Sequence, residues 1–592
     1  MTSSLFASCC VYGLLSLGLG WPIAARLAVP ATEKLLAGVA LSLIGVFLSG
    51  WLVYTLALPV SILWILPALA AAGLIGRRSA LLEAWREAPL RDLLNTQLIV
   101  TAWSVGWLSL VVNYSGGSWV GDWFGHWQRT QFFLEQGPPD ILFNGFDPLT
   151  SRPPFANIVI GAFITLTVTD FAHYQLALTF LGSLAFLPAA VLIQLPPWRA
   201  AQFSEAPTGQ RTALLGVFFM LNPLWVQNTT FAWTKLPAAF FTLAAIHYFL
   251  AADHARVRSA SVLAAAVLAA ALLTHYSAGP YAAVFALAWI YGGRAHYREI
   301  AWWRETALAA SVGVALLATW FGWSVNKYGG HGTFLTNTSV TDLAPNVSSQ
   351  LATIALNVRD TLVPHFLRSA AAADIDQTSP WGWWRDWFFF LYQVNLPWAV
   401  GSVAWLVLLV ILYRRARATA PRVCLGWLGA ISGTILLGVA AHGARAPWGL
   451  AHICLQPLVL TGLGLLAAEW VILPVRWRRL LIIGALVDGI VGIALSFGIQ
   501  SFLLDQWLTP GRSLPETMAS YTQISQINLN AKRWFKLEFL GDRFSAHETL
   551  ILAILGALLL LALYRASLPT RTPTAASPVA PATAPAPRNT IA

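Results

Sequence analysis

The chain has 592 residues, of which 57% are apolar (AVILMFWYC) and only 10% are charged, and its formal net charge is +11. Soluble proteins contain about 25% charged residues, so this chain has too few charges to cover a soluble surface. The composition excludes a string of soluble domains and predicts an all-α polytopic membrane protein.

Long stretches without Asp, Glu, Lys or Arg separate the charged residues. None of these residues lies between Lys34 and Arg77, or between Arg258 and Arg294, and each gap has room for two spanning helices of roughly 20 residues. We predict about 13–15 transmembrane helices. The candidate spans are residues 8–27, 34–56, 58–76, 95–113, 172–194, 211–226, 236–252, 260–275, 279–293, 305–325, 389–412, 423–441, 450–471, 480–500 and 547–564.

The basic residues predict the orientation of these spans. The loop at 77–94 carries four arginines, which places it in the cytoplasm. The basic clusters at 256–258, 294–304, 414–422 and 476–479 then also lie inside, provided that 154–170 lies along or re-enters the outer leaflet. If 154–170 is instead an ordinary span, another helix has been misassigned. The expected protein is a multi-pass protein of the inner (plasma) membrane, with its N-terminus outside and its C-terminus in the cytoplasm.

Loop lengths and composition divide the chain into regions. The predicted regions are N-terminal transmembrane helices with a cytoplasmic loop (1–94), a transmembrane core (95–330) with an outward loop at 114–171, an outward loop (331–388), C-terminal transmembrane helices (389–565) with an outward loop at 501–546, and a tail (566–592). The tail is rich in Pro, Ala and Thr and cannot bury a core, so we expect it to be a disordered cytoplasmic segment.

The first outward loop contains a pattern typical of an amphipathic helix at a membrane surface. Asp122, His126 and Arg129 are spaced i, i+4, i+7 and share one face of a helix over 122–136, and aromatic residues such as Trp123 supply the apolar remainder. A carboxylate at the helix N-terminus is stabilised by the helix amide groups. The alternative is that Asp122 is only an N-cap and that the tryptophans are only membrane anchors.

Three features of residues 95–330 occur together: a span followed by a long outward loop that opens with an acidic residue on a juxtamembrane helix, then "RPP" (152–154) before an apolar helix, then "FFMLNPLWVQNTTFAWTKLPAAFF" (218–241). This arrangement resembles the GT-C glycosyltransferases, which include protein O-mannosyltransferases and aminoarabinose transferases that use polyprenyl-phosphate sugars. The chain departs from many members, which have Asp-Glu where this chain has Asp122-Trp123. It also has Asn228 and Lys235 where oligosaccharyltransferases carry an acidic metal ligand.

The resemblance implies a GT-C-like catalytic core and a reaction at the outer face, in which an acceptor hydroxyl attacks a sugar carried on a lipid phosphate. Asp122 matches the family position of the general base that takes the acceptor proton. His126 is the second candidate catalytic residue, through a hydrogen bond to Asp122 or to a substrate hydroxyl. A surface histidine without a role is the alternative.

Such a reaction needs cations to hold the lipid phosphate and to stabilise it as a leaving group. The candidates are Arg129, Arg152, Lys235 and Arg445, near span ends on the outward side, where the alternative is snorkelling to the lipid headgroups. His275, in "THYSAGPY" (274–281), is a candidate for lining the lipid entrance, although Gly-Pro in that motif is sufficient for a hairpin.

No cofactor is expected, since the lipid-linked sugar is a substrate, and no metal-ligand spacing is present, although a metal requirement stays open. The expected partners are membrane lipid, a polyprenyl-phosphate sugar and a glycan, lipid or protein acceptor, but no nucleic acid. Two other functions fit the composition. One is a lipid-linked saccharide transporter or flippase, for which Asp488 and Glu469 are the intramembrane acids. The other is a non-catalytic GT-C-like protein that binds glycan.

Overall fold

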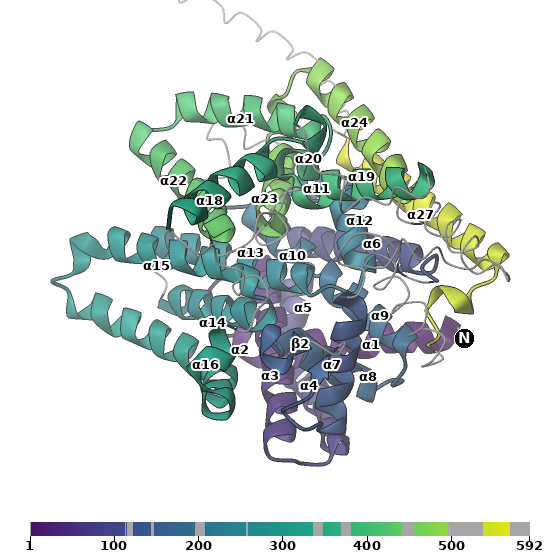
Figure 1. The fold of residues 1–592 in the computed structure, drawn as a ribbon, viewed down its shortest axis with the longest axis vertical. Coiled ribbons are helices and arrows are strands. Elements are labelled where there is room, and N and C mark those ends of the chain that lie inside the picture. Colours follow the sequence, from purple (N-terminus) through teal and green to yellow (C-terminus); the bar gives the residue numbers. More distant parts are fainter. Residues whose placement is uncertain are drawn as a thin grey trace, which may run out of the picture.

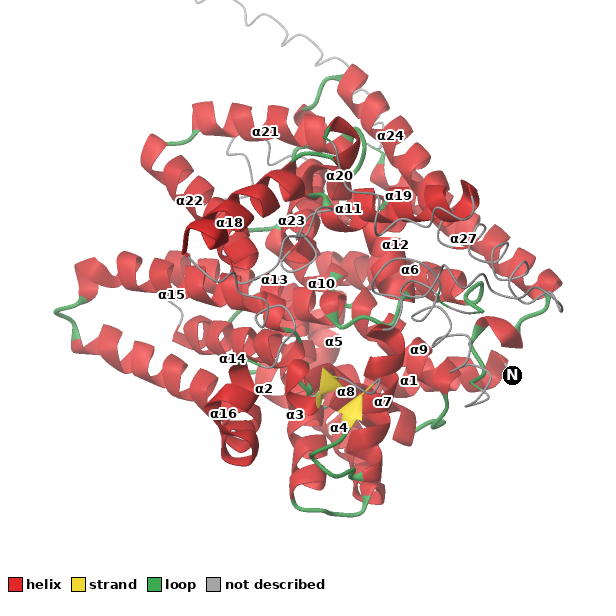
Figure 2. Cartoon of the chain, viewed as in Figure 1, coloured by secondary structure: helices red, strands yellow, loops and turns green. Residues whose placement is uncertain are grey.

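The computed structural model describes residues 2–112, 114, 122–143, 147–195, 208–255, 258–335, 347–368, 380–440, 455–494, 497 and 537–568. Helices make up nearly all the regular structure of these ranges (Figures 1 and 2). The exception is a short antiparallel pair, β1 (Leu142–Phe143) and β2 (Asp147–Pro148), in which Phe143 pairs with Asp147. The predicted all-α polytopic fold class is confirmed.

The described helices are named here in chain order. In the first part of the chain they are α1 (Thr2–Gly18), α2 (Trp21–Ala24), α3 (Ala31–Thr55), α4 (Ile65–Gly76), α5 (Arg78–Arg86), α6 (Ala88–Leu108), α7 (Asp122–Glu135), α8 (Phe155–Thr165), α9 (Phe171–Ser183), α10 (Phe186–Leu192), α11 (Thr208–Leu221), α12 (Pro223–Thr230), α13 (Lys235–Ala255), α14 (Arg258–Thr274), α15 (Gly279–Gly293) and α16 (Ile300–Phe334). The later helices are α18 (Val347–Leu362), α19 (Pro380–Val394), α20 (Leu396–Val400), α21 (Ala404–Ala418), α22 (Pro421–Ala440), α23 (Leu455–Ala468), α24 (Val475–Ile493) and α27 (Ala546–Ser567).

Each predicted span overlaps at least one of these helices, but several spans are broken. In the described ranges, six helices are long and apolar enough to cross a membrane, or seven if the bent pair Val60–Gly76 and Arg78–Arg86 is one span. The predicted span 211–226 divides at Asn222, whose Oδ1 accepts a hydrogen bond of 3.0 Å from the Trp225 amide at the start of α12. Pro223 suits this first turn because it has no amide hydrogen to satisfy.

The outer helices expose an apolar surface that only lipid can cover. Within the most apolar windows of α16, α22 and α27, only 17%, 17% and 6% of the residues are buried, although all three windows are strongly hydrophobic. The window over α9 and α10 is 94% buried and lies in the interior. Such large exposed apolar surfaces do not occur on soluble monomers, so these three helices face the membrane.

Helix α8 lies within the segment 154–170, on which the predicted orientation depends. It has 11 residues and is about 16 Å long at 1.5 Å per residue, against a hydrocarbon core of about 30 Å. Residues Phe155–Ile164 are all buried, and the helix packs against α7, α3 and α9. A helix this short and this enclosed favours the re-entrant alternative over an ordinary span.

The orientation itself leads to a test. Reporter fusions placed in the loops at 253–258 and 414–422 are expected to report cytoplasm, because both loops are basic and short. Alkaline phosphatase should be inactive and green fluorescent protein fluorescent at both positions. A periplasmic signal at either loop would contradict the orientation, and with it the outward placement of Asp122.

Candidate functional site

Helix α7 begins at Asp122, as the spacing of Asp122, His126 and Arg129 predicts. Its aromatic residues do not face lipid, which corrects the expectation that they press the helix onto the membrane surface. Trp123 and Trp127 are both almost fully buried. Both rings pack against Phe171, with centroids 5.0 Å and 5.6 Å away, because α9 covers this side of α7. The helix is therefore held by protein on its apolar side.

The carboxylate of Asp122 lies between two groups from other segments. The indole Nε1 of Trp233 donates a hydrogen bond of 3.1 Å to Oδ2, and Nη2 of Arg152 lies 3.6 Å from Oδ1. The side chain keeps 28% of its surface exposed, so a substrate can reach it. The contacts of a simple helix cap would be to the first turn of α7, whereas these come from loops at 147–154 and 231–234.

Lys235 opens α13 beside the same tryptophan. Its Nζ lies 3.9 Å from the centroid of the Trp233 ring, a cation–π contact, and the residue is 6% exposed. The ring thus contacts the carboxylate through its N–H edge and the ammonium through its face. Trp233 was not among the predicted site residues. Its position two residues before a predicted phosphate ligand was the available signal.

Arg129 binds the segment 147–152, which carries Arg152, through hydrogen bonds and an ion pair. Its Nη2 donates a 2.7 Å hydrogen bond to Ser151 Oγ, its Nη1 donates to the carbonyl of Gly125 at 3.1 Å, and Asp147 lies 3.8 Å away. Burial, followed by the charge of Arg152, lowers the pKa of Arg129 to about 9. Arg129 therefore positions the 147–152 segment, and its direct binding of phosphate stays a prediction.

Burial and then nearby cations lower the pKa values of the two predicted histidines. Burial, followed by the charges of Arg129 and Arg152, holds the pKa of His126 well below its ordinary value. His275 responds in the same way to burial and then to Lys235 and Arg152. Both imidazoles are consequently neutral at pH 7 and add no charge to the site.

The two histidines differ in their hydrogen bonds. His275 Nδ1 accepts a 3.0 Å hydrogen bond from the Ser277 amide, which begins a turn at Tyr276–Ala278. Tyr276 Oη in turn donates to the Thr150 carbonyl at 2.8 Å and joins this loop to the 147–152 segment. No hydrogen bond joins His126 to Asp122 among the described residues. Arg445 lies outside the described residues.

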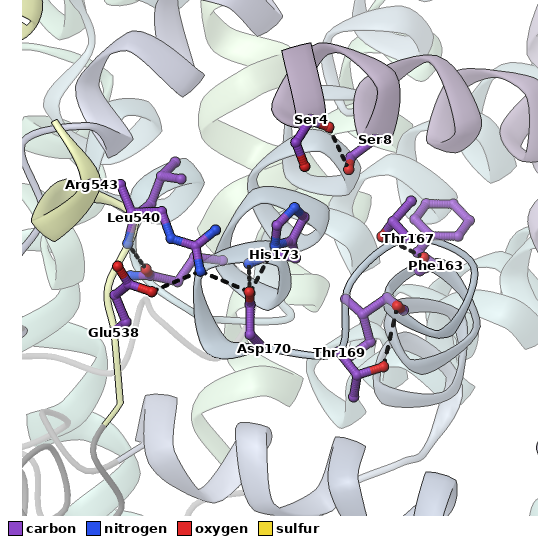
Figure 3. Close-up of polar contacts among 12 residues, drawn as sticks. Ser4, Ser8, Phe163, Thr167, Thr169, Asp170, His173, Glu538, Leu540 and Arg543 are labelled. Atoms are coloured by element: carbon purple, nitrogen blue, oxygen red, sulfur yellow. Dashed lines mark hydrogen bonds and ion pairs between the residues drawn. The ribbon is translucent and has the colours of Figure 1, made fainter. Parts of the chain in front are cut away.

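Residues 537–545, here called the C-terminal clip, bring a distant part of the chain to the site. Phe539 packs on Trp123, the neighbour of Asp122, with ring centroids 5.4 Å apart. Figure 3 shows Arg543 reaching Asp170, and its Nη2 donates to Asp170 Oδ2 at 2.7 Å. Asp170 also accepts from the backbone amide and Nδ1 of His173, at 2.7 Å and 2.8 Å. The clip was not predicted from the sequence.

Loss of the clip contact is expected to cost stability in a pH-dependent way. Burial raises the pKa of Asp170, but hydrogen bonds from His173 and Arg543 outweigh it and lower the pKa from 3.8 to about 2. The folded-state pKa is depressed, so the stabilisation is complete above about pH 4 and is lost as the pH falls toward 2. Arg543→Ala should cost about 1 kcal/mol at pH 7, since the pair is partly exposed.

Thermal unfolding of the purified protein in detergent at pH 7 and pH 3 checks this expectation. The difference in melting temperature between wild type and Arg543→Ala should be smaller at pH 3 than at pH 7. Arg565→Ala, at the exposed end of α27, is the matched control and should leave the melting temperature unchanged at both values. A gap that stays constant from pH 7 to pH 3 would show that Asp170 is not the partner that matters.

Within the ranges that the structure describes, no group of three or more His, Cys, Asp or Glu side chains is arranged to hold a metal ion. The metal requirement therefore stays untested. The site that the structure does assemble comprises one carboxylate, two cations and a tryptophan between them, contributed by α7, the 147–152 segment and the start of α13.

Comparisons with known proteins found no matching family model and no matching curated protein. Two solved structures are similar in fold. The crystal structure of ArnT from Cupriavidus metallidurans bound to undecaprenyl phosphate is 16% identical, with a TM-score of 0.42 and coverage of 81% of this chain and 77% of that chain. The structure of the same protein in the apo state is also 16% identical, with a TM-score of 0.41 and coverage of 79% of this chain and 75% of that chain.

Proposed function

We propose that this protein is a membrane glycosyltransferase that moves a sugar from a polyprenyl-phosphate donor to an acceptor hydroxyl at the outer face of the membrane. The observation that carries the proposal is the position of Asp122, a partly exposed carboxylate with Trp233 and Arg152 in contact and Lys235 on the other side of the tryptophan. A base and two cations at one site are the groups that this transfer requires.

The reaction follows from these positions. Asp122 takes the proton of the acceptor hydroxyl as its oxygen forms a bond to the anomeric carbon. The bond between that carbon and the phosphate oxygen breaks, and the lipid phosphate leaves with its electron pair. Arg152 and Lys235 stabilise the leaving phosphate.

Transport of a lipid-linked saccharide is less well supported, because the two acids that could couple it to an ion are engaged in packing. Asp488 accepts from Tyr392 Oη at 2.7 Å and from the Ser402 amide at 2.8 Å, where the backbone turns through Gly401 at φ +136°. Glu469 pairs with Arg415. Asp488 therefore joins α24 to α19 and to the turn between α20 and α21, and Glu469 joins the end of α23 to α21.

Transfer by the purified protein tests the proposal directly. The protein, reconstituted in lipid nanodiscs, is incubated with polyprenyl phosphate carrying a radiolabelled sugar and with envelope glycan, lipid or peptide acceptors. We expect labelled product from wild type and none from Asp122→Asn. Binding of the donor without any transfer would favour the non-catalytic glycan-binding alternative, and movement of intact donor across the bilayer would favour the flippase.

A further inference from the structure

A second polar pair lies behind Asp122, between α7 and α8. His126 and Asn157 are 4% and 1% exposed. Asn157 is in the first turn of α8, and one turn further on Gly161 faces Thr130 of α7, so that the faces 126/130 and 157/161 oppose each other. A side-chain interaction of hydrogen-bonding type with Asn157 partly offsets the lowering of the His126 pKa, so the two side chains lie next to each other.

Three polar atoms of this pair have no hydrogen-bond partner of good geometry. Neither Nδ2 nor Oδ1 of Asn157, nor Nδ1 of His126, has a partner in the part of the chain that the structure describes. Buried side-chain amides are nearly always hydrogen-bonded, and leaving one unsatisfied costs stability. Asn222 shows the ordinary behaviour in the same protein, since its amide bonds to Ala399, Val400 and Trp225.

The surroundings define the kind of ligand that would satisfy these atoms. A neutral imidazole offers one donor and one acceptor, and an asparagine amide offers both as well. Anions would be drawn to the charged groups Arg152 and Lys235 instead, whose charges act on His126. A hydroxyl, which donates and accepts at once, matches the pair.

We propose that His126 and Asn157 form a recognition site for a hydroxyl group of the donor sugar. This inference rests on the proposed function and extends it, because it names the part of the protein that reads the sugar rather than the lipid phosphate. His126 lies one turn after Asp122 in α7, and Asn157 follows Arg152 by five residues, so the proposed hydroxyl site adjoins the elements that carry the carboxylate and one of the cations.

Asn157→Leu separates this role from a structural one, since leucine nearly conserves the volume. Replacing an asparagine whose hydrogen bonds stabilise the fold would lower the melting temperature, whereas replacing an unsatisfied asparagine would not. We expect the melting temperature of the donor-free Asn157→Leu protein to stay equal to wild type or to rise. Asn222→Leu is the matched control and should lower it, because three hydrogen bonds are lost.

Binding supplies the second readout. Titrations use bare polyprenyl phosphate and polyprenyl phosphate carrying mannose, glucose or arabinose. Asn157→Leu is expected to bind the bare lipid phosphate as wild type does, and to bind the preferred sugar-bearing lipid about tenfold more weakly, the effect of one hydrogen-bonded hydroxyl. Asn157→Ser, which keeps a donor and an acceptor, should recover part of the loss.

Two results would overturn the inference: an unchanged preference for the sugar-bearing lipid in Asn157→Leu, or an equal loss for both lipids together with a lower melting temperature. Failure of the proposed function has a different signature, because wild type would then transfer no sugar. A protein that transfers sugar in an Asp122-dependent manner but tolerates Asn157→Leu contradicts the hydroxyl site alone.

Discussion

Asp122→Asn is expected to lower turnover by about 10²–10⁴-fold, the usual contribution of a positioned general base. The amide keeps the shape of the carboxylate and can still accept the hydrogen bond from Trp233 Nε1. It cannot take the acceptor proton. The partly exposed ion pair with Arg152 contributes little to stability, so the variant should fold, melt and bind donor nearly as wild type does.

Steady-state turnover with a polyprenyl-phosphate sugar, together with thermal unfolding, checks this expectation. Asp140→Asn, an exposed acid in the same outward segment, is the matched control and should retain full turnover. Asp122→Ala tests the helix-cap alternative, because loss of a cap costs about 1 kcal/mol. If Asp122→Asn is fully active and only Asp122→Ala is unstable, Asp122 is a cap and the proposed mechanism is wrong.

Lys235→Ala is expected to weaken the apparent affinity for the lipid-linked donor by about 10- to 100-fold, because a hydrogen bond to a charged group contributes about 1.5–3 kcal/mol. The Nζ of Lys235 is buried against the Trp233 ring, and a bound phosphate would supply a negative charge that favours its ammonium form. Lys235→Arg keeps the charge and should lose less.

The measurement is the donor KM, or direct binding of bare polyprenyl phosphate, for both variants. Lys327→Ala removes an exposed cation near the C-terminal end of α16 and serves as the control for a general loss of surface charge. Equal donor affinity in wild type, Lys235→Ala and Lys235→Arg would mean that Lys235 only extends toward the lipid headgroups and that another cation holds the phosphate.

Helix positions were predictable from the sequence because charge-free stretches have the length that a membrane imposes. The breaks were not. Asn222 and Asn395 each cap a new helix from inside a predicted span, at 3.0 Å and 3.1 Å from the amide three residues on. Hydropathy averaged over a span does not register one asparagine with a proline one or two residues after it, although that combination is a local cap signal.

Site residues that lie on one helix were predictable from the sequence. Contacts between residues from different helices and loops were harder to predict. The face of α7 that carries Asp122 and His126 follows from helical spacing. Contact of Asp122 with Trp233 joins residues 111 positions apart, which no local pattern shows. The burial of Trp123 was missed for the same reason, since tryptophan suits both a membrane surface and a protein interior.

The C-terminal clip also has a consequence for biogenesis. Arg543 is made 373 residues after its partner Asp170, a delay of about 20–75 s at about 5–20 residues per second. During that interval helix α7 has already been synthesised, but Trp123 lacks the covering Phe539 ring. In a nascent chain, the site around Asp122 therefore lacks its contacts with the C-terminal clip until residues 537–545 have been synthesised. Chains that terminate before residue 537 are expected to reach the membrane without a competent site, which delays activity until synthesis is nearly complete.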